Sequence, residues 1–359
     1  MKLSVFARSL AFLLLLTMVF SLAACGSTAG GDDTSASDTT KAPEVTTDGE
    51  TDPVETEPSV DASLPVKVTV LNGTTGFGMA KLMQDKADGK AMLNYTFDVQ
   101  ADAQNVTKAL INGSTDIAAL PTNAAATVYT KTNGAVQVLA LNTLGVLYVL
   151  ADSEEHAVSS FEALRGKTVY APANNPAIIF SAICEANGLK VGTDITVDTT
   201  YAEPAALRNA VVAGEVELAV LPEPMVTIAK KQNTALVTAL DLTAEWDKVF
   251  PAGTLAQGCV VVRKEFAEAH PAEIAAFLEE YEASITFMKE NPADAATMIV
   301  AQNIFAGAAP VAAAAIPKCN VTFLAGDAMK SALTGFYETL KGVDANSPVP
   351  ADDFYYGAK

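Results

Sequence analysis

A pattern of short strands and helices repeats within this chain at an offset of about 101 residues. The clearest pair of matching segments is KALINGSTDIAALPTN, beginning at Lys108, and NAVVAGEVELAVLPEP, beginning at Asn209. Both contain the end of a helix, a glycine, an acidic residue, a short apolar strand and a Leu-Pro exit. The other strand segments that correspond are 66–71 with 167–172, 95–100 with 196–201, and 135–142 with 235–242. The repeat predicts an α/β fold of two similar lobes.

One further apolar strand follows each copy of the repeat, beginning at Leu144 and at Gly258. Short strands separated by helices favour a mostly parallel sheet in each lobe, flanked by helices and joined by right-handed crossovers. The pattern then changes, because the next segment has helical periodicity. Its apolar face is made by Ile274, Phe277, Leu278, Tyr281 and Ile285. Asn291 and Pro292 predict the start of a second helix.

Residues 1–24 have the pattern of a lipoprotein signal peptide. Lys2 and Arg8 precede an apolar stretch over 10–22 that is too short for a stable membrane anchor. The letters LAAC then place Cys25 where bacterial lipoproteins carry their lipid. An ordinary signal peptide followed by a chance cysteine is the alternative. The pattern predicts a secreted chain that is held at the membrane through lipidated Cys25.

Residues 25–63 have the composition of a disordered acidic tether. Between 26 and 62, ten acidic residues stand against one lysine, and large apolar side chains are almost absent. Such a segment cannot bury enough surface to offset its chain entropy. The whole chain carries a formal net charge of −19, and the residues after the tether are also acidic. This charge disfavours binding to nucleic acid.

Motifs for catalysis are missing from the sequence. His156 and His270 lie in charged, loop-like surroundings, which favours solvated surface positions. Gly73, Gly76 and Gly78 have neither the Gly-Lys-Ser/Thr ending of a phosphate-binding loop nor the spacing of a dinucleotide fold. We therefore predict a protein that is not an enzyme and that needs no cofactor.

The cysteines fit neither a disulfide framework nor a metal site. Cys184, Cys259 and Cys319 follow the predicted lipidation site, and their spacing matches no zinc pattern. One disulfide between Cys259 and Cys319 remains open at this stage. No metal is expected.

Small polar and aromatic side chains follow the predicted strands in both lobes. Ligands of open α/β sheets bind beyond the carboxyl ends of the strands, so the two sets predict one cleft between the lobes. The candidate ligand-binding residues are Thr74, Thr75, Gly76, Phe77, Asn123, Asn142, Asn174, Asn175, Tyr201 and Glu223. We expect Thr74 or Thr75 to cap a helix that begins near Gly76, and the other threonine to donate to the ligand.

The strand-end loops restrict the class of ligand. They contain no arginine or lysine, which argues against a clamp for the carboxylate of an amino acid. A nitrogen heterocycle of pyrimidine type remains, as does an organosulfonate or another small anion. An inward Glu223 would accept hydrogen bonds from an amino-substituted ring, whereas an outward, solvated position is the alternative. Phe77 and Tyr201 would sandwich a ring, with packing in the core as the alternative.

The body from Val66 to Tyr356 resembles a known family. The segments that carry the resemblance are GTTGFGMAKLM, GSTDIAALPTNAA, LALNTLGVLYVL, FEALRGKTVYAP, GEVELAVLPEPMVTIA, DLTAEWDKV, VVRKEFAEAHPAEIAAFLEEY and DDFYY. In this order, behind the LAAC motif, they resemble the solute-binding lipoproteins of bacterial ABC importers. These proteins have the type II periplasmic-binding fold. The branch is the one that includes binding proteins for sulfonates, taurine, nitrate and thiamine-precursor pyrimidines.

The resemblance implies an arrangement and a role. Lobe 1 would be 64–143 plus 256–359, and lobe 2 would be 144–255, joined by two crossover strands. The protein would be a monomer that captures a small molecule and delivers it to an ABC permease. A lipoprotein sensor that presents its ligand without transport is one alternative. A pyrimidine-synthase-like enzyme of the same fold is another, although the sequence lacks that enzyme's cysteine- and histidine-rich segment for iron.

Overall fold

The computed structural model describes residues 59–359. The predicted signal peptide, Cys25 and most of the predicted tether lie outside the described residues. The last residues of that tether form a turn instead, in which the Asp61 N–H donates to a Glu273 carboxylate oxygen at 2.7 Å and the Ser63 hydroxyl donates to Asp61. No helix within 59–359 combines the length and apolarity needed to cross a membrane.

Sheet A contains six strands in the order β11-β4-β10-β3-β1-β2. Their bounds are β1 Pro65–Leu71, β2 Asn94–Gln100, β3 Ile117–Pro121, β4 Val136–Thr143, β10 Gly258–Arg263 and β11 Val321–Leu324. β1 pairs in parallel with β2 and β3, whereas β10 runs antiparallel between β3 and β4. β11 extends the sheet beyond β4 and is also antiparallel to it.

Sheet B contains five strands in the order β7-β6-β8-β5-β9. Their bounds are β5 Leu147–Ala151, β6 Thr168–Tyr170, β7 Thr196–Asp198, β8 Leu218–Pro222 and β9 Val237–Asp241. β6 pairs in parallel with β7 and β8, and β5 runs antiparallel between β8 and β9.

The two sheets exchange one strand each. β5, which follows the first copy of the repeat, inserts into the sheet of the second copy, and β10, which follows the second copy, inserts into the sheet of the first. Both strands take the same place in the order, between the third and fourth strands of a copy. Two sheets of corresponding strand order, joined by this exchange, confirm the predicted two-lobed α/β fold. The prediction of mostly parallel sheets is wrong: both sheets are mixed, because each exchanged strand pairs antiparallel with both of its neighbours.

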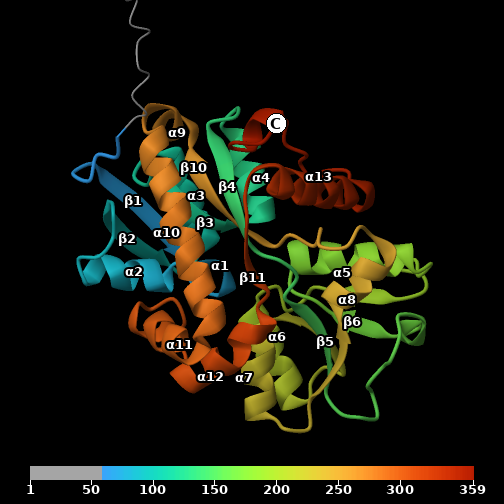
Figure 1. Cartoon of the computed structure of the whole chain (residues 1–359). Coiled ribbons are helices and arrows are strands. Elements are labelled where there is room, and N and C mark those ends of the chain that lie inside the picture. The colour runs from blue at the N-terminus through green and yellow to red at the C-terminus, as the bar shows by residue number, and fades with distance from the viewer. Residues whose placement is uncertain (1–58) are drawn as a thin grey trace, which may run out of the picture. The chain divides into compact units, whose positions relative to one another are not determined.

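Thirteen α-helices and three short 3-10 helices are assigned within 59–359; the α-helices are the ones numbered in Figure 1. Their bounds are α1 Thr74–Phe77, α2 Ala80–Ala87, α3 Ala103–Ile111, α4 Thr122–Lys131, α5 Asn175–Ala186, α6 Pro204–Ala213, α7 Met225–Gln232, α8 Leu242–Val249, α9 Lys264–Ala269, α10 Pro271–Glu290, α11 Pro292–Ala301, α12 Ala309–Ala315 and α13 Gly326–Val343. The predicted apolar face of α10 is confirmed: Ile274, Phe277, Tyr281 and Ile285 are buried in the core beside sheet A. A second helix begins at Pro292 as expected.

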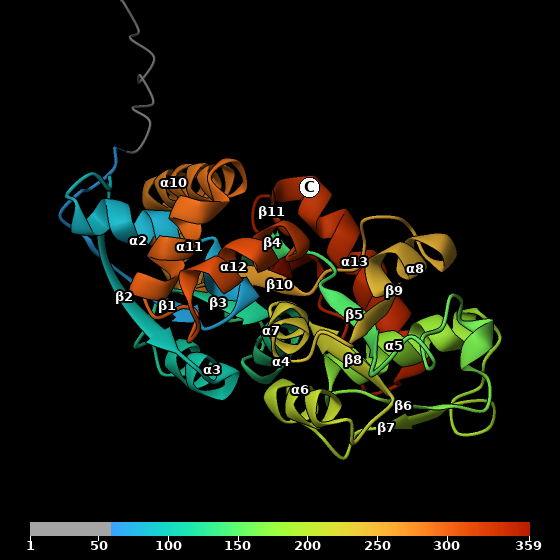
Figure 2. The same cartoon turned by 90° about the horizontal axis from the view of Figure 1, so that it is seen from below.

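Contacts between helices also join the lobes, besides the crossing segments. α13 packs on β4 of sheet A and on α5 beside sheet B (Figure 1). The Phe336 ring of α13 lies 5.9 Å from the Trp246 ring of α8, between ring centroids. α12 contacts α7, and Figure 2 shows these two helices near the middle of the molecule. The segments that cross between the sheets are themselves joined, because the Gln257 N–H donates to the Thr143 carbonyl and the Val146 N–H donates to the Gln257 side chain.

Candidate functional site

A cavity of about 140 Å³ lies between the first turns of α4 and α5. Its floor and wall come from the C-terminal half of α13 and the loop that follows. The lining residues are Asn123, Thr127, Asn174, Asn175, Ile178, Tyr337, Leu340, Asp344, Asn346, Ser347 and Pro348. α4 follows β3 of sheet A and α5 follows β6 of sheet B, so both sheets contribute a helix N-terminus to one cavity.

Asn175 contributes a buried amide to this cavity. The residue is 7 % exposed, and its Oδ1 has no hydrogen-bond partner among the residues that the structure describes. Asn175 is the first residue of α5 and is followed by Pro176, whose missing N–H suits the first turn of a helix. The preceding Asn174 is exposed and has a φ of 66°, a left-handed conformation that asparagine tolerates better than most residues. A buried acceptor without a partner among the described residues is costly, and a turn of the Asn175 side chain toward the cavity would let a donor on a ligand satisfy it.

Asn123 faces the same cavity from the first turn of α4. The preceding residue is held from both sides, because the Thr122 N–H donates to the Gln257 carbonyl and the Tyr337 hydroxyl donates to the Thr122 carbonyl. Thr127 lies one turn further along, and its hydroxyl donates to the Asn123 carbonyl at 2.8 Å. The first amides of a helix have no intrahelical acceptor and carry partial positive charge, so this end of α4 favours electronegative atoms of a ligand.

Asp344 is the one charged residue among those that line the cavity in the described chain. One of its carboxylate oxygens accepts from the Asn346 N–H at 2.9 Å. The cavity therefore combines neutral amides and hydroxyls with a single negative charge. This set suits a ligand that presents N–H or O–H donors more than it suits a bare anion.

Glu223 is buried, and its carboxylate is turned toward its own helix. Its two oxygens accept from the Thr227 N–H at 3.0 Å and from the Thr227 hydroxyl at 2.9 Å. The residue is 1 % exposed, and burial raises the pKa of its carboxyl group, although the hydrogen bonds from Thr227 oppose the shift. Glu223 does not line the cavity, and it satisfies the first turn of α7 instead.

Asn142, Thr75 and Gly76 meet at the end of sheet A. The Asn142 side-chain N–H donates to the Thr75 carbonyl at 2.9 Å, and its oxygen accepts from the Thr143 hydroxyl at 3.0 Å. A Cβ on Gly76 would lie 2.2 Å from the Leu71 carbonyl oxygen, so a glycine is required there. All three are buried, and they fix α1 against the first crossing segment.

The predicted cap of α1 is wrong. The helix begins at Thr74 rather than near Gly76, and Gly73 stands at its N-cap with a φ of 104°. No side chain caps this helix, because glycine has none and the threonines already lie inside the first turn. Thr74 is half-buried and Thr75 is buried, and neither lines the cavity.

The two candidate aromatic residues pack within their own lobes. Phe77 is fully buried, and its ring lies 6.3 Å from that of Phe305 in an edge-to-face pair. Tyr201 contacts Tyr170 at 5.9 Å between ring centroids, and its hydroxyl donates to Glu215 at 3.2 Å. The structure therefore brings Asn123, Asn174 and Asn175 together, and it places the other candidate residues elsewhere.

Several lining residues lie outside the sequence prediction. Thr127 follows Asn123 by one helical turn, so the spacing of four residues was a signal that could have found it. Tyr337 and the loop 344–348 come from a part of the chain without strand-end motifs, and the sequence offers no comparable signal for them.

The three cysteines in the described residues are free and buried, so the bridge between Cys259 and Cys319 is not formed. Burial raises the pKa of each thiol, which keeps it in the unreactive protonated form. Within 59–359 no group of three or more histidine, cysteine or acidic side chains is placed to hold a metal ion.

Solved structures share this architecture. An ABC transporter structure from Parabacteroides distasonis matches with a TM-score of 0.67 at 22% identity, over 82% of this chain and 99% of that chain. The periplasmic aliphatic sulphonate binding protein SsuA of Escherichia coli matches with a TM-score of 0.64 at 18% identity, over 81% and 90%. The alkanesulfonate-binding protein SsuA of Xanthomonas axonopodis pv. citri, bound to MOPS, matches with a TM-score of 0.60 at 13% identity, over 82% and 96%.

These likenesses confirm the two-lobed fold of periplasmic binding proteins. No curated protein matches the chain. The family model described as NMT1/THI5 like matches residues 90–295. This range contains β2, β3, β4 and β10 of sheet A, both crossing segments, all of sheet B and all of α10. More than half of the chain is thus covered, and the protein belongs to the NMT1/THI5-like family.

Proposed function

We propose that the protein is an extracytoplasmic, lipid-anchored solute-binding protein of an ABC importer. It captures a small molecule in the cavity between α4 and α5 and delivers it to the permease. The observation that carries this proposal is the meeting of Asn123 from one lobe with Asn174 and Asn175 from the other. A ligand held by both lobes stabilises their closed arrangement, which is how a two-lobed protein presents cargo.

The lining supports a neutral, hydrogen-bonding cargo. Asn175 offers a buried acceptor that has no partner within 59–359, and Asp344 adds a negative charge at the loop after α13. An amino-substituted pyrimidine presents N–H donors to both groups and ring nitrogens to the first amides of α4. An alkanesulfonate presents acceptors alone, and Asp344 would repel it. We therefore favour the heterocycle over the anion.

Anchoring is the part of the proposal that rests on the N-terminal sequence. The LAAC motif places a lipid on Cys25, and the acidic segment after it would hold the binding unit away from the membrane surface. The solute-binding role needs no nucleophile or metal, in line with the buried, protonated thiols.

A ligand screen tests the proposal. The unit from Thr56 to Lys359 is compact, and its thermal unfolding is measured with aminopyrimidines and with alkanesulfonates. We expect an aminopyrimidine at about 1 mM to raise the melting temperature, because a ligand that binds only the folded state stabilises it by mass action. Stabilisation by alkanesulfonates alone would refute the heterocycle, and no stabilisation by either class would refute capture of these cargoes.

The cavity is then located by substitution. Asn123→Ala should weaken cargo binding about three- to tenfold, since a neutral hydrogen bond contributes about 1 kcal/mol. Asn105→Ala on the exposed side of α3 is the matched control and should bind as the wild type does. Equal affinities for all three proteins would show that the cargo binds elsewhere.

A further inference from the structure

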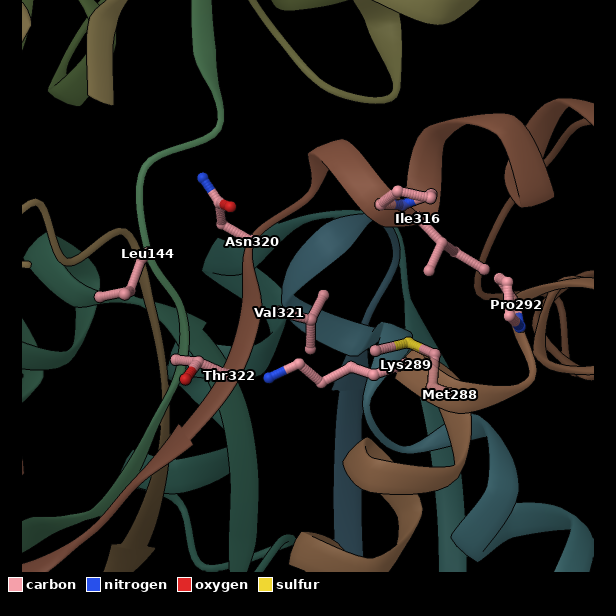
Figure 3. Close-up of a pocket in the computed structure, with 9 residues that line it drawn as sticks. Leu144, Met288, Lys289, Pro292, Ile316, Asn320, Val321 and Thr322 are labelled. Carbon is pink, nitrogen blue, oxygen red and sulfur yellow. The ribbon is translucent and has the colours of Figure 1, made fainter. Parts of the chain in front are cut away.

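A second and larger pocket lies beside the first crossing segment. It has a volume of about 390 Å³ and is lined by the end of α10, the start of α11, the turn before β11 and β11 itself (Figure 3). The lining residues are Leu144, Met288, Lys289, Pro292, Ile316, Pro317, Asn320, Val321 and Thr322. None of them lines the cavity between α4 and α5.

The walls of this pocket are mostly apolar. Met288, Ile316 and Val321 are 2 %, 5 % and 6 % exposed, so their side chains are fixed by the core behind them. Leu144 and two prolines complete the apolar surface. A pocket of this volume, with apolar walls and a few polar groups, has the dimensions of a small-molecule site.

Lys289 supplies the one charge among the lining residues of the described chain. In the view of Figure 3 its side chain extends beneath Val321, with the ammonium toward the Thr322 hydroxyl. The ammonium forms no salt bridge with any acidic group in 59–359. A positive charge beside an apolar wall attracts an anion that has an apolar body, and it repels a cation.

Asn320 connects the pocket to the crossing segment. Its carbonyl accepts from the Leu144 N–H at 3.1 Å, and its side-chain N–H donates to the Gly145 carbonyl. Its backbone is held at a φ of 42°. The segment that joins the two sheets thus forms one wall of the pocket, and two hydrogen bonds fix that wall.

We propose that this pocket is a second small-molecule site, which takes an organic anion with an apolar body such as a medium-chain carboxylate. The carboxylate lies against the Lys289 ammonium and the Thr322 hydroxyl, and the alkyl chain covers Val321, Ile316 and Met288. The cavity between α4 and α5 contains a negative charge where this pocket contains a positive one, so the two sites select different ligands. This second site does not depend on which cargo binds between α4 and α5.

The test follows the methyl group of Met288 in the full-length protein. The chain is labelled with carbon-13 at its methionine methyl groups and titrated with hexanoate, and the Met288 signal is assigned by its loss in Met288→Leu. We expect this signal to shift with hexanoate, and to shift much less with the neutral analogue 1-hexanol. No shift of the Met288 signal at about 10 mM hexanoate, which corresponds to less than about 3 kcal/mol of binding, would overturn the proposal.

Substitutions in the pocket test whether hexanoate binds there and not elsewhere on the protein. Lys289→Gln should weaken hexanoate binding about two- to fivefold, as expected for an exposed ion pair. Thr322→Trp, on an edge strand that accepts aromatic residues, should fill the pocket and abolish the shift. Lys108→Gln makes the same change of charge on α3 and should have no effect. Hexanoate binding that is lost in Asn175→Leu but kept in Lys289→Gln would place the anion in the other cavity and refute this site.

Discussion

Replacing Asn175 by leucine should make the folded protein more stable and its cargo binding weaker. The Oδ1 atom of Asn175 is buried and unpaired among the described residues, and such an atom costs about 1–3 kcal/mol. Leucine has nearly the same shape and removes that cost, because it has no buried oxygen to leave unpaired. We expect the free energy of unfolding to rise by about 1–2 kcal/mol and the melting temperature by roughly 2–6 °C.

Cargo binding should change in the opposite direction. A donor on the ligand that meets the Asn175 oxygen in the wild type would be buried without a partner in Asn175→Leu. We expect the dissociation constant to rise about ten- to a hundredfold, equivalent to about 1.4–2.7 kcal/mol. Urea unfolding without ligand and calorimetry with the cargo from the screen measure the two effects.

Thr243→Val is the matched control for this prediction. The Thr243 hydroxyl is also buried without a partner in the described chain, but it lies outside the cavity. This variant should gain stability and keep wild-type affinity. A loss of stability in Asn175→Leu, or an unchanged affinity for the cargo, would refute the assignment of Asn175 as an acceptor that awaits a ligand.

Three other predictions concern closure, anchoring and pH. Saturating cargo should lower the radius of gyration of the two-lobed unit in small-angle scattering, and an unchanged profile at proven saturation would exclude closure of the lobes. Cys25→Ser expressed in bacteria should leave the membrane fraction, and the lipid anchor is wrong if this variant stays membrane-bound and the wild type takes up no labelled palmitate. The hydrogen bond from His156 to Asp152 at 2.6 Å raises the pKa of the His156 imidazole. The protonated imidazole therefore stabilises the fold at a pH below the ordinary histidine pKa, and this stabilisation is lost as the pH rises through the raised pKa. Proton NMR should therefore find a pKa above about 6.5 that falls in Asp152→Asn, and an unchanged pKa in that variant would contradict this cause.

The sequence was sufficient for most of the strands. The Leu-Pro exits after Leu120 and Leu221 mark β3 and β8 because an apolar run followed by proline has few other structures. β11 was missed, since Val321–Leu324 is an edge strand of only four residues, which is too short to show a periodic pattern. The role of β10 in the first sheet came from the resemblance and not from the pattern of its residues.

The candidate site was predictable only in part, because strand-end position does not determine where a side chain points. Asn123 and Asn175 share a cavity, whereas Glu223 turns back to Thr227 of its own helix. Phe77 follows the same glycine-rich turn that suggested a ring-binding role, yet its ring completes the core against Phe305. Tertiary packing decides which way each of these side chains points, and that packing cannot be read from the local pattern of one sequence.

The exchange of β5 and β10 also orders the events of folding. During synthesis β3 and β4 are made early, but the strand that lies between them is made only after every strand of sheet B. Until Gly258–Arg263 has emerged, β3 and β4 therefore expose unpaired edges, which are templates for aggregation. Sheet B has all its strands by Asp241 and can form first. If the first half of the chain folded on leaving the ribosome, sheet A would still lack its central strand β10 and would not be stable. This connectivity therefore suits a polypeptide that stays unfolded until nearly all of it has been synthesised.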